Sequence, residues 1–181
     1  MDILDDKFKE IFYSQLVSII GGLIAGTLIA VYANNLLLIP GMLIILPGFL
    51  EMRGNISGSL AARLTAGMFL GVVKPNRIRT KIVGGNVVAS FILAIIVSLF
   101  LGLVAFAFNL FVLNLFWPKI IFLPLIAGII ANAIEIPITI FFTFYLFRRG
   151  HDPNDIMGPF ITSTGDITSV LSLLFVAMVI L

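Results

Sequence analysis

The segment IVGGNVVASFILAIIVSLFLGLVAFAFN, residues 82–109, decides the class of this protein. It carries no charged side chain, and it is longer than the ~20 residues that a helix needs to cross a bilayer core of about 30 Å. Working outward from it, three more stretches have the same apolar character: residues 11–33, 119–147 and about 157–181. The sequence therefore predicts a polytopic, all-α integral membrane protein whose first partner is the lipid bilayer.

The composition supports this class and excludes others. Hydrophobic residues make up 60% of the 181 residues and charged residues 11%, against about 45–50% and about 25% in soluble domains. Such a chain does not fit a soluble enzyme, a disordered chain or a nucleic-acid binder. With no cysteine and one histidine, thiol chemistry and thiolate metal sites are also excluded. We expect no enzymatic activity.

Residues 36–73 are harder to interpret, because one straight helix of this length would be roughly 57 Å long. Either the stretch forms two spans with a turn at Glu51–Asn55, or it forms one long, broken span. The positive-inside rule favours one span. The basic residues near the ends of the spans then gather on one side of the membrane, except Lys119; they are Lys7, Lys9, Lys74, Arg77, Arg79, Lys81, Arg148 and Arg149.

The predicted domain organisation is a single transmembrane domain over residues 1–181 with five helices, of which the second is broken. The spans are residues 11–33, 36–73, 82–109, 119–147 and 157–181. Residues 1–10 (MDILDDKFKE) read as an interfacial cytoplasmic segment. The N-terminus is expected in the cytoplasm and the C-terminus outside, in a multi-pass protein of the cell membrane.

Three carboxylates at membrane depth are functional candidates, because ionisable groups there are costly. Asp166 and Glu135 both lie near mid-membrane by their distance from the span ends, and Glu51 lies in the second span. Thr162 and Ser169 share a helix face with Asp166, whereas Asn132 shares one with Glu135. Oxygen donors of this kind suit hard cations such as Mg²⁺ or Ca²⁺.

Each candidate also has a structural interpretation. Glu51 could pair with Arg53, two residues away, or reach an interface. Glu135 could pair with Arg63, which we expect at a similar depth, and this pairing is favoured over direct metal contact. Asp166 could relay protons, although the hydroxyls on its face favour cation binding.

Two segments resemble a known family. The segment PGFLEMRGNISGSLAARLTAG (Pro47–Gly67) resembles the second helix of MgtE-type magnesium transporters and their eukaryotic solute-carrier relatives. The segment GHDPNDIMGPFITSTGDITSVL (Gly150–Leu171) resembles the signature that opens the fifth helix of that family. The resemblance covers essentially the whole membrane module.

The resemblance implies a five-helix protomer, a homodimer and a central path for Mg²⁺. By position it implies that Asp166 binds the ion and that Asn55 lies near the pore. With the oxygen donors above, the expected metal residues are Asp166, Glu135, Asn55 and Thr162. The residues expected to line the pore or to pair structurally are Glu51, Arg63, Ser59, Asn132 and Ser169.

The predicted function is therefore a divalent-cation channel or transporter, with Mg²⁺ as its first substrate. A Na⁺- or H⁺-coupled exchanger, with Glu135 or Asp166 as the coupling site, is the alternative, and a non-transporting membrane subunit is a third possibility. Small residues at Gly22 and Gly26, and at Gly67 and Gly71, have the spacing of close helix packing. A dimer would let few helices enclose a polar path.

Overall fold

The computed structural model describes the backbone of residues 2–180 and the side chains of residues 7–179. Met1 and Leu181 lie outside the described residues. The predicted location of the C-terminal residue, outside the cell, therefore concerns a residue that the structure does not describe. Residues 2–10 form the first turns of the first helix, which continues without interruption to Val31.

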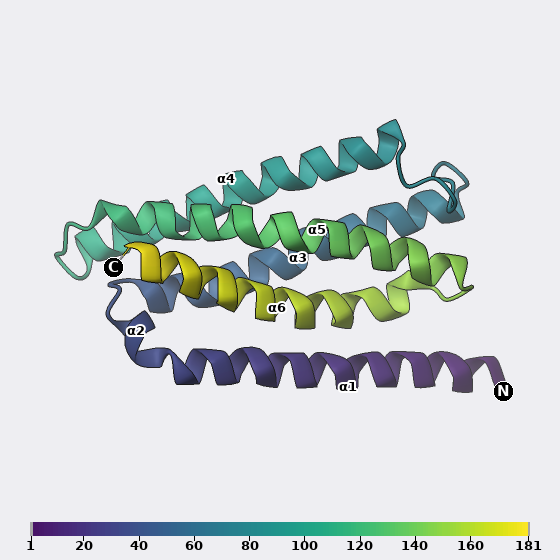
Figure 1. The fold of residues 1–181 in the computed structure, drawn as a ribbon, viewed down its shortest axis with the longest axis horizontal. Coiled ribbons are helices and arrows are strands. Elements are labelled where there is room, and N and C mark those ends of the chain that lie inside the picture. Colours follow the sequence, from purple (N-terminus) through teal and green to yellow (C-terminus); the bar gives the residue numbers. More distant parts are fainter. Residues whose placement is uncertain (1, 181) are drawn as a thin grey trace.

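Five long helices lie side by side along one axis (Figure 1). They are α1 (Asp2–Val31), α3 (Met42–Phe69), α4 (Lys81–Phe111), α5 (Phe122–Arg148) and α6 (Pro153–Ile180). The short helix α2 (Ala33–Leu37) follows α1, and the 3₁₀ turn η1 (Pro118–Ile121) leads into α5. Residues 2–180 contain no strand, and the expected all-α fold is confirmed.

The stretch that was hardest to interpret is one continuous helix over most of its length. The chain turns at residues 38–41, between α2 and α3, and there is no turn at Glu51–Asn55. Pro47 lies within α3 without ending it. Helices in membranes tolerate proline where neighbouring helices satisfy the freed backbone groups.

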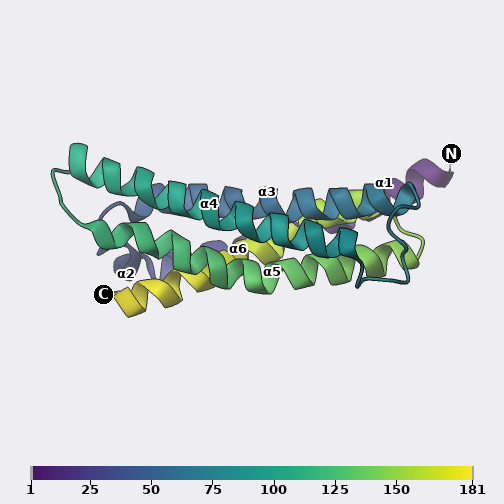
Figure 2. The same cartoon turned by 90° about the horizontal axis from the view of Figure 1, so that it is seen from above.

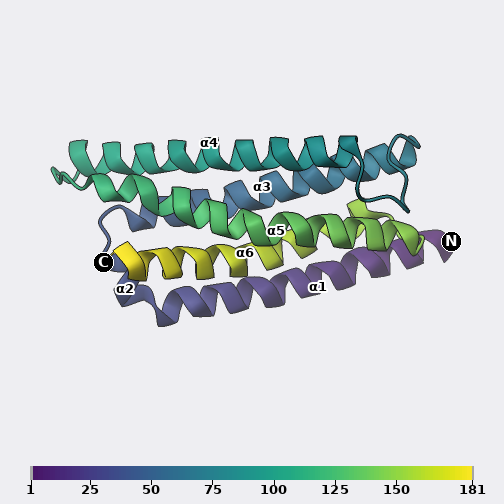
Figure 3. The same ribbon diagram turned by 45° about the horizontal axis from the view of Figure 1, so that its top comes forward.

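Four helical segments among the described residues are long and apolar enough to cross a membrane: Lys7–Val31, Lys81–Phe111, Pro118–Arg148 and Pro153–Val179. The chain is thus a multi-pass membrane protein. Helix α3 is not among the four, since Glu51, Arg53 and Arg63 lower its hydropathy. It nevertheless packs against α4, α5 and α6 over the length of the bundle (Figure 3).

Helix α6 holds the bundle together, because it packs against α1, α3 and α5. Helix α4 covers α3 and α5 from the other side, as the view in Figure 2 shows. The loop after α3, the turn between α5 and α6 and the start of α1 all lie at one end of the bundle (Figure 1). Helix α6 ends at the opposite end, beside α2.

Glycines close two of the helices at that first end. Gly71 after α3 and Gly150 after α5 have φ angles of +72° and +84°, a conformation that favours glycine. Val73 N donates to Gly67 O at 2.9 Å, and His151 N donates to Leu146 O at 3.2 Å. These bonds satisfy carbonyl groups that a helix end otherwise leaves free.

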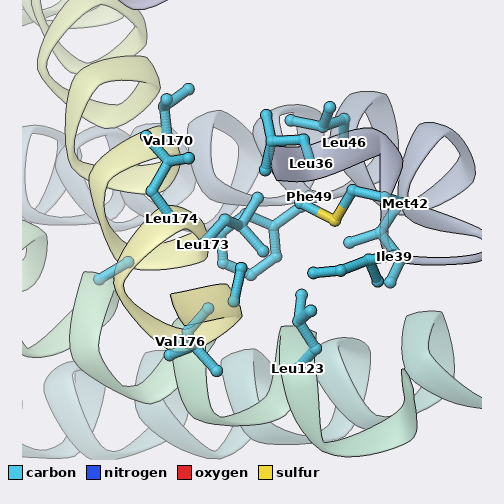
Figure 4. Packing of buried hydrophobic residues seen from close by; sticks show 14 of the residues in the cluster. Leu36, Ile39, Met42, Leu46, Phe49, Leu123, Val170, Leu173, Leu174 and Val176 are labelled. Atoms are coloured by element: carbon cyan, nitrogen blue, oxygen red, sulfur yellow. The ribbon is translucent and has the colours of Figure 1, made fainter. Parts of the chain in front are cut away.

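The apolar interior is divided along the bundle axis. One cluster centres on Phe49 of α3, with Leu123 of α5 and Leu173 of α6 around it (Figure 4). A second cluster, which contains Leu60 and Phe144, lies toward the end with the α3–α4 loop. Between them α3 and α5 bury polar side chains, namely Arg53, Ser57, Asn132, Glu135 and Thr139.

The arrangement of loops predicts a labelling pattern. Single cysteines at Asn76 and Asn154, both exposed, should react with a membrane-impermeant maleimide from the same, cytoplasmic side. A cysteine at Leu113 should react from the opposite side. Labelling of residues 76 and 154 from different sides would contradict the topology.

A close backbone contact predicts a stability effect. A Cβ atom at Gly102 of α4 would lie 2.9 Å from Ile121 Cα and would also collide with the Ile121 carbonyl oxygen. The substitution Gly102→Ala should therefore destabilise the protein by about 1–3 kcal/mol and lower its melting temperature in detergent.

The matched control is Gly22→Ala, because nothing lies within 4 Å of a Cβ atom at that position. Alanine is also the better helix former, so its melting temperature should be unchanged or higher. Equal melting temperatures for the two variants would contradict the close packing at Gly102.

Candidate functional site

A polar groove of about 440 Å³ lies between α3 and α6. The lining residues of α3 are spaced three or four positions apart, and those of α6 are spaced four apart. Each wall of the groove is therefore formed by one face of a helix. The lining residues are Pro47, Leu50, Glu51, Gly54, Asn55, Gly58, Gly158, Thr162 and Asp166. The groove brings together three of the four predicted metal residues, and Glu51 with them.

Two carboxylates face each other in this groove. Glu51 is exposed and Asp166 is half-buried, and they are close enough for their like charges to repel. No ion pair or hydrogen bond within the described part of the chain involves the Asp166 carboxylate. The groove is therefore anionic, and a cation would relieve the repulsion.

The neutral residues of the groove supply further oxygen atoms. Asn55 Nδ2 donates to Glu51 Oε1 at 3.1 Å, which leaves the Asn55 amide oxygen free to accept or to coordinate. Thr162 Oγ1 donates its proton to Gly158 O at 3.0 Å, so its lone pairs remain available. The three glycines of the groove add no side chains that would fill it.

Glu135 is not a groove residue. Its side chain is fully buried among α3, α5 and α6, and Glu135 Oε2 lies 3.6 Å from Arg53 Nη2. Thr164 donates to Glu135 Oε1 at 2.8 Å and Thr168 to Glu135 Oε2 at 3.2 Å. The carboxylate is thus compensated inside the protomer.

The expected pairing of Glu135 with Arg63 is wrong, and so is the pairing of Glu51 with Arg53. Arg63 lies on the edge of α3 that faces α4, where its Nε donates to Asn86 Oδ1 at 2.8 Å. Its other nitrogens donate to Ser59 Oγ at 2.8 Å and Ser90 Oγ at 3.1 Å. Arg53 lies on the inward face of α3 and is completely buried, which explains why it reaches Glu135.

The remaining two candidates, Asn132 and Ser169, are completely buried. Asn132 donates to Gly128 O at 2.7 Å on its own helix. Ser169 is completely buried and does not line the groove, although it shares a helix face with Thr162 and Asp166 in projection. Both side chains keep a buried oxygen atom that has no hydrogen-bond partner among the described residues.

The role of Arg53 was missed by sequence reasoning, although a signal exists. Phe49, Ile56 and Leu60 are buried, and Arg53 falls on the same face of α3, where an arginine requires a buried partner. Thr164 and Thr168 were also missed. They stand one turn apart on α6, on the face that meets Glu135.

The groove offers two carboxylates from one chain, Glu51 and Asp166. Within the described part of the molecule, no three His, Cys, Asp or Glu side chains gather closely enough to hold a metal. Two carboxylates, an amide and a hydroxyl can attract a hard cation that keeps part of its water shell. This chemistry is suited to passing an ion along rather than to trapping it.

Comparison with known proteins agrees with this chemistry. The family model MgtE, described as divalent cation transporter, matches residues 46–176, which include both walls of the groove. No curated protein matches the chain.

Proposed function

Because the chain belongs to the MgtE family of divalent cation transporters, we propose that it carries Mg²⁺ across the membrane along the α3–α6 groove. Two copies related by a two-fold axis close the path, each contributing one such groove. Asp166 and Glu51 attract the ion, and Asn55 and Thr162 supply neutral oxygen atoms to it and to its water molecules.

The observation that carries this proposal is the pair of uncompensated carboxylates near the middle of the bundle. Asp166 stands close to the centre of α6, and Glu51 faces it across the groove. A charge at this depth is costly unless it faces a partner or a watery path. Since no basic side chain in the described chain pairs with Asp166, a mobile cation is the natural counter-charge.

The choice of Mg²⁺ rests on the ligand set. Every polar side chain in the groove offers oxygen, and none offers sulfur or imidazole. Mg²⁺ prefers oxygen ligands in octahedral geometry and gives up its water reluctantly. A groove with two carboxylates per chain suits a partly hydrated ion, in which water molecules complete the coordination.

In this proposal α3 is the fifth span, in addition to the four apolar segments. Its polar residues face the groove, the buried ion pair or α4, so its low hydropathy reflects function. With the basic loops in the cytoplasm, the membrane potential would favour entry of the cation by ~2.3 kcal/mol per unit charge per 100 mV.

The same reasoning supports a homodimer. Glu51, Asn55 and Thr162 are exposed on the single protomer, at a depth where exposure would mean contact with lipid. A second copy placed over the groove removes that cost and doubles the number of carboxylates. No observation favours a Na⁺- or H⁺-coupled exchanger, and Arg53 compensates one of its two candidate coupling sites.

The charge of Asp166 can be tested without changing its shape. Asp166→Asn should lower Mg²⁺ flux into proteoliposomes by at least about tenfold, because two charges leave the path of the dimer. Its melting temperature should stay the same or rise, because a costly charge has been removed.

Glu10→Gln is the control, since it also removes one carboxylate but lies at the bundle end, beside His151. Its flux should equal that of the wild type. If Asp166→Asn transports Mg²⁺ at the normal rate while remaining folded, Asp166 is not the ion site.

The dimer proposal predicts a specific cross-link. Thr162→Cys would place one thiol in each groove, facing the two-fold axis, and a short bis-maleimide should join two chains. Val88→Cys on the exposed side of α4 should give no comparable product. A single-chain particle in mild detergent, with no cross-link at residue 162 and undiminished flux, would refute the shared path.

A further inference from the structure

A buried ion pair lies directly behind the groove. Arg53 Nη2 is 3.6 Å from Glu135 Oε2, and both side chains have no exposed surface. The same Nη2 atom donates to Thr168 Oγ1 at 3.5 Å, and Thr168 donates to Glu135 Oε2 at 3.2 Å. The pair therefore links α3, α5 and α6 through one short chain of polar contacts.

On α3 and α6, the residues that form or contact the pair stand two positions from groove residues. On α3, Arg53 stands between Glu51 and Asn55 in sequence and points into the bundle, whereas they line the groove. On α6, Thr164 and Thr168 flank Asp166 in the same way and bind Glu135. The charge of Glu135 is close enough to interact with that of Asp166, so the pair and the groove influence one another electrostatically.

We infer that Glu135 acts as the counter-charge of Arg53, and that the Arg53–Glu135 pair is a positioning element that keeps the groove anionic without touching the ion. This inference rests on the proposed function, since it concerns the affinity of the groove for a cation. In this inference Glu135 is not a metal ligand. Its carboxylate already contacts Arg53, Thr164 and Thr168, and it lies outside the groove.

The two members of the pair are not equivalent, because an arginine side chain stays protonated and a carboxylate can take up a proton. Glu135→Gln leaves a permanent positive charge behind the groove, which repels a cation. Arg53→Gln leaves a carboxyl group, which either becomes neutral or adds to the negative potential. The two single substitutions should therefore have unequal effects on cation affinity.

The double variant Arg53→Gln, Glu135→Gln separates the possible roles. A counter-charge is needed only while Arg53 is present, so the double variant should recover the cation affinity of the wild type. If Glu135 were a ligand, the double variant would have lost that ligand and would bind Mg²⁺ weakly. If the pair served packing alone, the substitutions would reduce stability, and the cation affinity would not depend on whether the remaining charge is positive or negative.

The experiment measures Mg²⁺ flux in proteoliposomes over a range of concentrations, together with the melting temperature in detergent without Mg²⁺. For Glu135→Gln the concentration for half-maximal flux should rise by about tenfold or more, as expected for an uncompensated charge near the path. For Arg53→Gln it should be unchanged or lower, and for the double variant it should stay within about twofold of the wild type. Arg53→Lys, which keeps the charge, should behave like the wild type.

Thr143→Val is the matched control in the buried interior of α5, because it removes a polar group but no charge. It can shift the melting temperature but should leave the half-maximal concentration unchanged. If Glu135→Gln does not fold, the double variant alone still distinguishes a counter-charge from a ligand.

The outcomes separate this inference from the proposed function. A wild-type protein without Mg²⁺ flux overturns the proposed function. A wild-type protein that transports, together with a folded double variant that needs at least about tenfold more Mg²⁺, overturns only the counter-charge role. Recovery in the double variant supports it.

Discussion

The cost of charge in a hydrocarbon environment is the constraint on which the rest of this structure depends. The bundle carries Arg53, Arg63, Glu51, Glu135 and Asp166 well inside its long helices, and it treats them in three ways. Arg53 and Glu135 compensate each other in the interior. Arg63 donates to three neutral oxygen atoms at the α3–α4 edge. Only Glu51 and Asp166 are left without a cationic partner among the described residues, and they share one groove.

The packing of the helices follows from this distribution of charge. The polar residues of α3 occupy separate faces, so the helix can bury one arginine, hold a second at its edge and still present a carboxylate to the groove. Apolar clusters above and below the buried pair hold the helices together at both ends of the bundle. The polar layer between them can therefore be tolerated, although a pair with a single 3.6 Å contact adds little stability of its own.

The sequence predicts the class of fold well, because long uncharged segments such as residues 82–109 have one stable form in a bilayer. It also brings Asn55, Thr162 and Asp166 to attention, and all three line the groove. Prediction from the sequence failed for the contacts that depend on how a helix is rotated about its axis. Depth alone suggested Arg63 as the partner of Glu135, whereas the inward face of α3 belongs to Arg53.

The glycines show the same limitation of prediction from the sequence. The spacing of Gly22 and Gly26 is typical of close packing, yet nothing within the protomer lies within 4 Å of a Cβ atom at either position. The close approaches to neighbouring helices include Gly102, beside the Ile121 backbone, and Gly21, one residue before the motif, beside Ser163. A spacing motif reports which residues share a helix face, but not which neighbour that face meets, and this depends on the whole bundle.

Charge compensation also connects the interior of the protein to its proposed activity. A path for a divalent cation needs negative potential, and one uncompensated arginine behind it would cancel one of its two carboxylates. In this proposal Glu135 on α5 offsets that arginine from outside the groove, and α3 and α6 remain free to form the walls of the groove. The groove therefore owes its net charge of two carboxylates per chain to a third carboxylate that lies outside it.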